Sequence, residues 1–167
     1  VSERKMPLSE NIAEKKVIVS ENKLGTICKT TQLHASVQTF EQLQAIFTQN
    51  VDRIYLDSDL YLQKKEQIDG LFKQMSSESQ VQNVQIYLAL PYIVRAKDKV
   101  YLQKLSQNLS EQIQGFLVRN LESASFVKQL SGNYDMVTDV SVYQFNKETA
   151  LFWSSYSKEG YLPYELN

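Results

Sequence analysis

Cysteine and histidine are nearly missing from this sequence of 167 residues, because each occurs once, as Cys28 and His34. A single cysteine excludes a disulfide within the chain, and one cysteine with one histidine cannot build a zinc site from these two residue types alone. Carboxylate-rich sites for Mg²⁺ or Ca²⁺ stay open, but no metal ligands are predicted. We expect Cys28 to be inert, since no base lies near it in the sequence.

Glycine is also scarce, with five residues in the whole chain. No Gly-x-Gly-x-x-Gly motif follows a strand-like segment and no Walker motif occurs, which argues against the nucleotide-binding versions of an α/β fold. Neither Gly-x-Ser-x-Gly nor His-Glu-x-x-His is present. The sequence therefore contains no self-contained hydrolase motif.

An excess of charge of either sign is lacking, because Lys and Arg together number 18 and Asp and Glu number 19. Because basic residues are not in excess, the chain as a whole does not carry the net positive charge that is typical of proteins that bind nucleic-acid phosphates. No apolar run approaches the roughly 20 residues of a membrane span, and the polar segment 1–5 does not begin a signal peptide. We therefore expect a cytoplasmic protein with no membrane partner.

What the sequence does contain is a regular alternation of two kinds of segment from residue 33 onward. Strand-like runs alternate with helical patterns of about 10 residues, which predicts crossover connections and a parallel sheet. The predicted strands are 33–37, 53–57, 84–90, 115–118, 139–143 and 160–162, and the helices begin near residues 40, 64, 98, 122 and 147.

This alternation fits either a doubly wound open sheet or a barrel. Because the nucleotide-binding motifs are missing and six units are too few for a complete eight-stranded barrel, we predict an incomplete TIM-like barrel. The predicted fold class is thus α/β, with parallel β/α units in residues 32–167. We expect this region to be truncated at its C-terminus.

Residues 1–31 read differently from the rest. Two short β-type runs, 16–19 and 26–28, flank a turn signal, which predicts a hairpin or the tail of a preceding module. Because the chain begins with Val1, we expect a piece excised from a longer polypeptide, which would be its first partner. The incomplete barrel would leave open sheet edges near Leu33 and Leu162, and such edges favour self-association.

Function in α/β barrels and open sheets is found at the carboxyl ends of the strands. The candidate ligand-binding residues at these positions are Arg95, Arg119, Asn120, Asn146 and Glu165. Arginine and amide groups suit a polar or anionic ligand. We expect Arg95, Arg119, Asn146 and Glu165 to cluster at one end of the sheet. Catalytic residues are not identified, and Arg119 and Asn120 could also be ordinary polar residues at a strand end.

Other conspicuous residues have structural interpretations. Asp57, Ser58 and Asp59 fit a loop and helix cap better than a metal site. His34 lies inside a predicted strand, which favours a packed, partly buried histidine. Most of the ten tyrosines lie on predicted strands or on the apolar faces of predicted helices, so packing explains them better than stacking on RNA bases.

Six segments, in order, carry a family resemblance. They are residues 35–43, 52–56, 90–95, 115–120, 145–149 and 162–167. Together they resemble the C-terminal region of long bacterial members of peptidase family U32, the collagenase-like proteases, over about residues 33–167. Leu162 stands where that family usually has serine in its Ser-Pro-Glu-Leu signature.

The resemblance implies a TIM-like barrel and a peptidase or a related modifying enzyme. Some relatives are associated with hydroxylation of RNA or of a quinone precursor and use an iron–sulfur cluster bound by four cysteines. With one cysteine this chain cannot bind such a cluster, so we expect no cofactor in it, and a cluster would belong to the rest of the parent.

Two functional hypotheses follow. The chain is either part of a U32-family peptidase that is inactive alone, with a polar or anionic ligand site at the carboxyl ends of the strands, or a non-catalytic recognition barrel that positions an RNA or protein substrate for another domain. In the second case the parent enzyme would modify RNA or a small molecule, and a peptide or RNA substrate remains a possible partner.

Overall fold

The computed structural model describes residues 31–77, 84–95, 98–157, 159–163 and 165. Apart from Thr31, these residues belong to the compact unit Gln32–Asn167. The predicted hairpin of residues 16–28, together with Cys28, lies outside the described residues, as do Leu166 and Asn167.

Six strands form one parallel sheet in the order β1-β2-β3-β4-β5-β6. Neighbours in the sheet are also neighbours in the sequence, so each pair of strands is joined by a crossover connection. The chain therefore has an α/β fold whose six parallel strands form a half-barrel, as predicted. The strands are β1 His34–Val37, β2 Arg53–Asp57, β3 Gln85–Ala89, β4 Ile113–Val118, β5 Asp135–Thr138 and β6 Glu159–Gly160.

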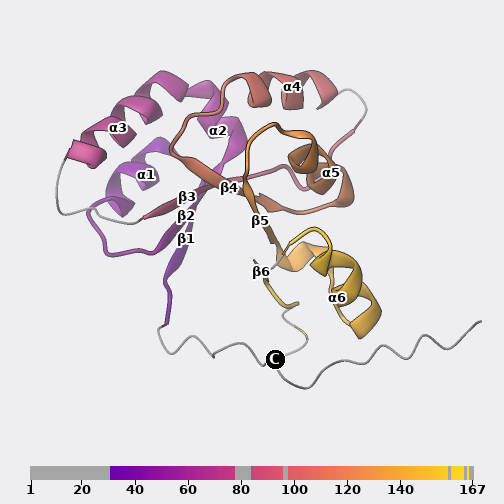
Figure 1. Ribbon diagram of the computed structural model, residues 1–167. Helices are drawn as coiled ribbons and strands as arrows, with labels where there is room; N and C mark the ends of the chain where they lie inside the picture. Colours follow the sequence, from indigo (N-terminus) through magenta and orange to yellow (C-terminus); the bar gives the residue numbers. More distant parts are fainter. Residues whose placement is uncertain (1–30, 78–83, 96–97, 158, 164, 166–167) are drawn as a thin grey trace, which may run out of the picture. The chain divides into compact units, whose positions relative to one another are not determined.

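Helices cover the outer face of this sheet, and Figure 1 shows α1 to α5 together on one side of it. The inner face carries no described helix. The helices are α1 Phe40–Ile46, α2 Ser58–Gln63, α3 Lys65–Ser77, α4 Lys99–Gln107, α5 Leu121–Gln129 and α6 Lys147–Ser154, with a short 3₁₀ helix, η2, at Val140–Val142.

Polar residues at the carboxyl ends of the strands begin several of these helices. Thr39 and Gln42 form a capping box at the start of α1. Asp57 accepts hydrogen bonds from the backbone N–H groups of Asp59, at 2.9 Å, and Leu60, at 3.1 Å. The interpretation of residues 57–59 as a helix cap is therefore confirmed.

Alternation along each strand separates two apolar clusters. Outward side chains such as Ile54, Leu88 and Phe116 pack under the helices in the main core. Inward side chains form a smaller cluster of Tyr55, Tyr87, Ala89, Leu117 and Val137. Successive side chains of each strand thus point alternately toward the helices and toward the interior of the half-barrel.

The prediction of a strand at residues 139–143 is wrong. The fifth strand is β5, four residues earlier, and the predicted segment forms η2. Asp139 caps η2 through its side chain, and Tyr143 ends it with φ 53°, so the backbone cannot continue as a strand. The sixth strand is also shorter than predicted, because only Glu159 and Gly160 pair with β5.

Candidate functional site

At the carboxyl ends of β4 and β5, Arg119 is the centre of a buried polar network. Its Nε donates to Oδ2 of Asp139 at 2.6 Å, and its Nη1 donates to the carbonyl oxygen of Leu90 at 3.1 Å. The two charged side chains are only 9% and 11% exposed. The positive charge of Arg119 is therefore neutralised inside the protein, and Nε and Nη1 both donate hydrogen bonds within it.

Asn120 connects the loop after β3 to α5. Its side-chain nitrogen donates to the carbonyl oxygens of Pro91 and Tyr92, both at 3.0 Å. Its side-chain oxygen accepts from the N–H of Ser123 at 2.7 Å and so caps α5. Every polar atom of this side chain is thus used to hold two neighbouring segments together.

The other three predicted site residues are not joined to this network. Arg95 is exposed and lines a groove between α4 and α5. Asn146 caps α6 by accepting from the N–H of Thr149 at 2.8 Å, and Glu165 is exposed. Within the described residues no hydrogen bond or ion pair connects them to Arg119. The structure therefore brings together Arg119 and Asn120, with Asp139 as a partner that the sequence did not indicate.

Exposed aromatic side chains belong to the same loops. Tyr92 is 60% exposed, and the guanidinium of Arg119 lies 3.9 Å from the centroid of its ring. Tyr143 and Phe145 stack with centroids 5.5 Å apart and ring planes 17° from parallel. Tyr143 has left-handed backbone geometry, which is uncommon outside glycine and occurs often at functional positions. A rigid polar network thus carries an accessible aromatic surface.

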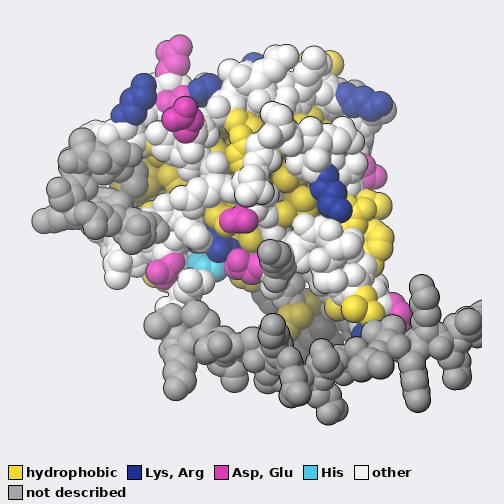
Figure 2. Space-filling view, viewed as in Figure 1, with side chains coloured by type: hydrophobic (Ala, Val, Ile, Leu, Met, Phe, Trp, Pro, Cys, Tyr) yellow, Lys and Arg dark blue, Asp and Glu magenta, His cyan; other side chains and the backbone are white. Residues whose placement is uncertain are grey.

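A second network lies on the inner face, at the amino-terminal ends of the strands. Arg53 donates from Nε to Gln85 at 2.8 Å and from Nη1 to the hydroxyl of Tyr55 at 3.0 Å. The same Nη1 lies 2.6 Å from Oε1 of Glu159, and the guanidinium lies 4.4 Å from the centroid of the Tyr87 ring. Figure 2 shows basic, histidine and acidic side chains gathered at this end of the sheet.

His34 extends this network to the first strand. Its Nδ1 lies 2.5 Å from the hydroxyl of Tyr161, which in turn donates to the hydroxyl of Tyr55 at 3.1 Å. Its Nε2 is buried without a hydrogen-bond partner among the described residues. The expectation of a packed, partly buried histidine is confirmed.

Burial and neighbouring charges shift the pKa values in this second network. Burial, and then the positive charge of Arg53, lower the pKa of His34 below its usual value. Burial alone would also lower the pKa of Arg53, but hydrogen bonds with Glu159 and Tyr55 raise it above its usual range. Burial raises the pKa of Tyr87 to about 12. The network therefore favours a neutral histidine beside a charged arginine.

Sequence reasoning missed this inner network because it considered only the carboxyl ends of the strands. One pattern in the sequence could have indicated it: in each of two strands a polar residue is followed two positions later by a tyrosine. These pairs are Arg53 with Tyr55 and Gln85 with Tyr87. In a parallel sheet such pairs share one face. In barrels this amino-terminal end contributes mainly to stability.

Neither network resembles a metal site or a nucleophile–base pair. Among the described residues no group of three or more His, Cys, Asp and Glu side chains could hold a metal ion. The hydrogen-bond partner of His34 is a tyrosine hydroxyl. No helix in the described part of the chain is long and apolar enough to cross a membrane.

Comparison with known proteins identifies no family for this chain. No family model matches the chain, and no curated protein matches it. Among solved structures, the chain is similar to the crystal structure of MenC from Desulfotalea psychrophila LSv54, with a TM-score of 0.44 and 13% sequence identity. The similarity covers 77% of this chain, but the chain spans only 36% of the MenC chain.

Proposed function

We propose that this domain is a non-catalytic recognition half-barrel of a larger cytoplasmic enzyme related to peptidase family U32. In this role it binds a polypeptide substrate at the carboxyl ends of β3 and β5. The chemical step would belong to the rest of the parent polypeptide, so the chain alone should not hydrolyse peptides.

One observation carries the proposal. Arg119 bonds to Asp139 and Asn120 bonds to backbone groups, whereas Tyr92, Tyr143 and Phe145 are 60%, 57% and 45% exposed. Exposed aromatic rings on a rigid support are typical of binding surfaces, because they bury a large area with little loss of conformational entropy. A peptide fits better than RNA, since Asp139 neutralises Arg119 and the chain has a net charge of -1.

The test is a binding titration of the ¹⁵N-labelled chain with peptides from a gelatin digest, and in parallel with short oligouridylate. We expect peptide-induced shifts in the loops of Tyr92 and Tyr143. Tyr92→Ala and Tyr143→Ala should each weaken binding by about fivefold to thirtyfold, the range of an aromatic interface contact. Val100→Ala is the matched control, because Val100 is 74% exposed but lies on α4.

Three outcomes would overturn the proposal. The first is the absence of peptide binding, or equal losses in the control variant. The second is RNA binding that exceeds peptide binding and depends on Tyr92. The third is hydrolysis of the gelatin peptides by the isolated chain, which would favour a peptidase site within it.

A further inference from the structure

A groove of about 1160 Å³ runs between α4 and α5 on the outer side of the half-barrel. Leu102, Phe126, Leu130 and Tyr134 contribute apolar side chains to it, and Ser106 and Ser125 are small. Its volume exceeds the usual range of a small-molecule site, which is about 300–1,000 Å³. A groove between two helices of this size suits an amphipathic helix, which would lie along it.

The groove has an uneven charge at the end near the loop after β3. Arg95, Lys99 and Glu122 line this end, so two cations face one carboxylate. Neither Arg95 nor Lys99 forms an ion pair within the described part of the chain. A helix that carries an acidic residue one turn before its apolar residues would complement this arrangement.

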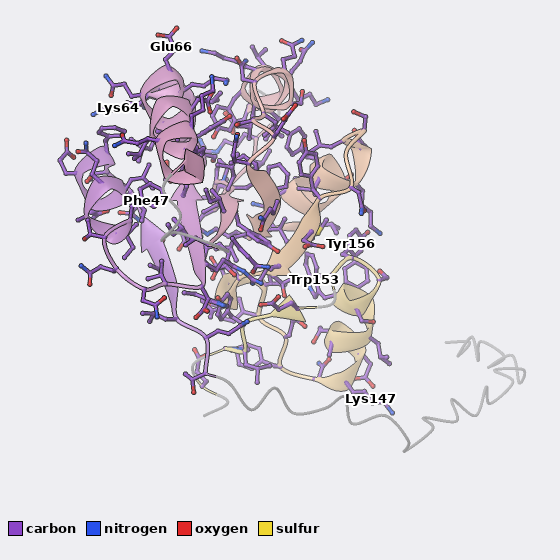
Figure 3. All side chains as sticks on the ribbon, turned by 60° about the vertical axis from the view of Figure 1, so that its left-hand side comes forward. Phe47, Lys64, Glu66, Lys147, Trp153 and Tyr156 are labelled. Atoms are coloured by element: carbon purple, nitrogen blue, oxygen red, sulfur yellow. The ribbon has the colours of Figure 1, made fainter. Side chains whose placement is uncertain are left out.

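The chain itself presents such a helix in α6. Leu151 is 53% exposed, Phe152 is 48% exposed, and Glu148 precedes them by three and four positions on the same exposed face. The opposite side of α6 faces its own sheet through the buried Trp153, and Figure 3 shows Trp153 and Tyr156 near the sheet with Lys147 at the far end of the helix.

We propose that α6 of one copy of this chain docks into the α4–α5 groove of a second copy. Glu148 would then pair with Arg95 and Lys99, while Leu151 and Phe152 cover Leu102 and Phe126. The face of α6 that carries Leu151 and Phe152 does not line its own groove, because Trp153 packs in the core and Lys128 of α5 donates a hydrogen bond to the carbonyl oxygen of Ser155 at 3.1 Å. Tyr156, which follows α6, is among the residues that line that groove.

This contact is heterologous, since the groove and α6 are different surfaces. Each added copy therefore leaves one groove and one α6 free, and association continues unless the rotation between copies closes a ring. One short helix buries less area than a standard interface, so the association should be weak and depend on concentration.

The experiment is sedimentation velocity on the full chain over a range of concentrations, with charge-reversed variants. Wild type should sediment faster as its concentration rises. Glu148→Arg and Arg95→Glu should each weaken association by about tenfold, because each places like charges opposite one another. Mixing the two variants should restore it, since the charge-reversed helix of the first variant suits the charge-reversed groove of the second.

Glu66→Arg is the matched control, because it makes the same charge change at an exposed position of α3 and should leave association unchanged. A wild-type chain that remains monomeric up to about millimolar concentration would overturn the proposal. Failure of the mixed variants to associate would also overturn the proposal. So would association of each single variant at the wild-type level, and that result would instead indicate pairing at the open sheet edges.

Discussion

The Nδ1 atom of His34 lies 2.5 Å from the hydroxyl of Tyr161, although 127 positions separate the two residues. His34 begins β1 and Tyr161 follows β6, so this contact joins the two edge strands of the sheet across its inner face. The strand ladder of the described residues runs from β1 to β6 without closing. Side chains therefore close the interior where the backbone does not.

Tyr161→Phe should destabilise the fold by about 1–2 kcal/mol, because it removes the hydroxyl that bonds both His34 and Tyr55. Urea unfolding followed by circular dichroism measures the change. Tyr143→Phe removes a hydroxyl from a side chain that is 57% exposed and should change the unfolding free energy very little. Equal losses in the two variants would mean that the contact between Tyr161 and His34 contributes nothing.

Stability should fall as the pH decreases through the usual pKa of histidine. The pKa of His34 is lowered below 6.5 in the folded chain, first by burial and then by Arg53, so the unfolded chain binds the proton more tightly. The free energy of unfolding therefore keeps its full value above about pH 6.5 and decreases between that pH and the lower folded pKa. Unfolding in urea at about pH 7.5 and about pH 5.5 tests this expectation.

His34→Gln is the control for this pH dependence, because glutamine does not titrate. The difference between the two pH values should be smaller in this variant than in wild type. Since the chain has one histidine, its ring resonances in the NMR spectrum also report the folded pKa directly. A folded pKa at or above 6.5 would contradict the prediction.

Glu159→Gln should destabilise the fold by about 1–2 kcal/mol, since it leaves the buried Arg53 with weaker compensation of its charge. The loss stays below that of a fully buried pair, because the Glu159 side chain is 47% exposed and water screens the interaction. Glu66→Gln, at an exposed position of α3, should have almost no effect. Thermal unfolding of both variants provides the comparison, and an unchanged Glu159→Gln variant would refute the prediction.

The order of the β/α units was predictable because apolar runs and helical periodicity were both strong. The predicted limits of β2, residues 53–57, coincide with the structure. β5 was misplaced because Val140, Val142 and Tyr143 offer a β-type pattern, whereas the true strand has only Met136 and Val137 as large apolar residues. α2 was missed because its six residues are too few to display a helical period.

The site was less predictable because its contacts depend on strand register and on curvature. Val118 is paired with Thr138, so the next residues, Arg119 and Asp139, emerge side by side. That register is not visible from either strand alone. The pair of Arg53 and Glu159 depends in addition on how far the sheet curls, which the sequence of a single strand does not specify.

Two glycines of this chain should respond in opposite ways to substitution by alanine. A Cβ atom at Gly115 would lie 2.4 Å from the carbonyl oxygen of Asp135 and 2.5 Å from the ring of Tyr87. Because Gly115 lies inside β4, the strands would have to move apart, and Gly115→Ala should cost about 1–3 kcal/mol or more. A Cβ atom at Gly70, in α3, would meet nothing within 4 Å.

Gly70→Ala should therefore stabilise the fold by about 0.5–1 kcal/mol, the difference between the two residues inside a helix. Urea unfolding of wild type and both variants gives the signs directly. A Gly115→Ala variant as stable as wild type would contradict the close approach of β4 to β5 and to Tyr87 on the inner face. A destabilised Gly70→Ala variant would instead indicate that this part of α3 is covered in solution.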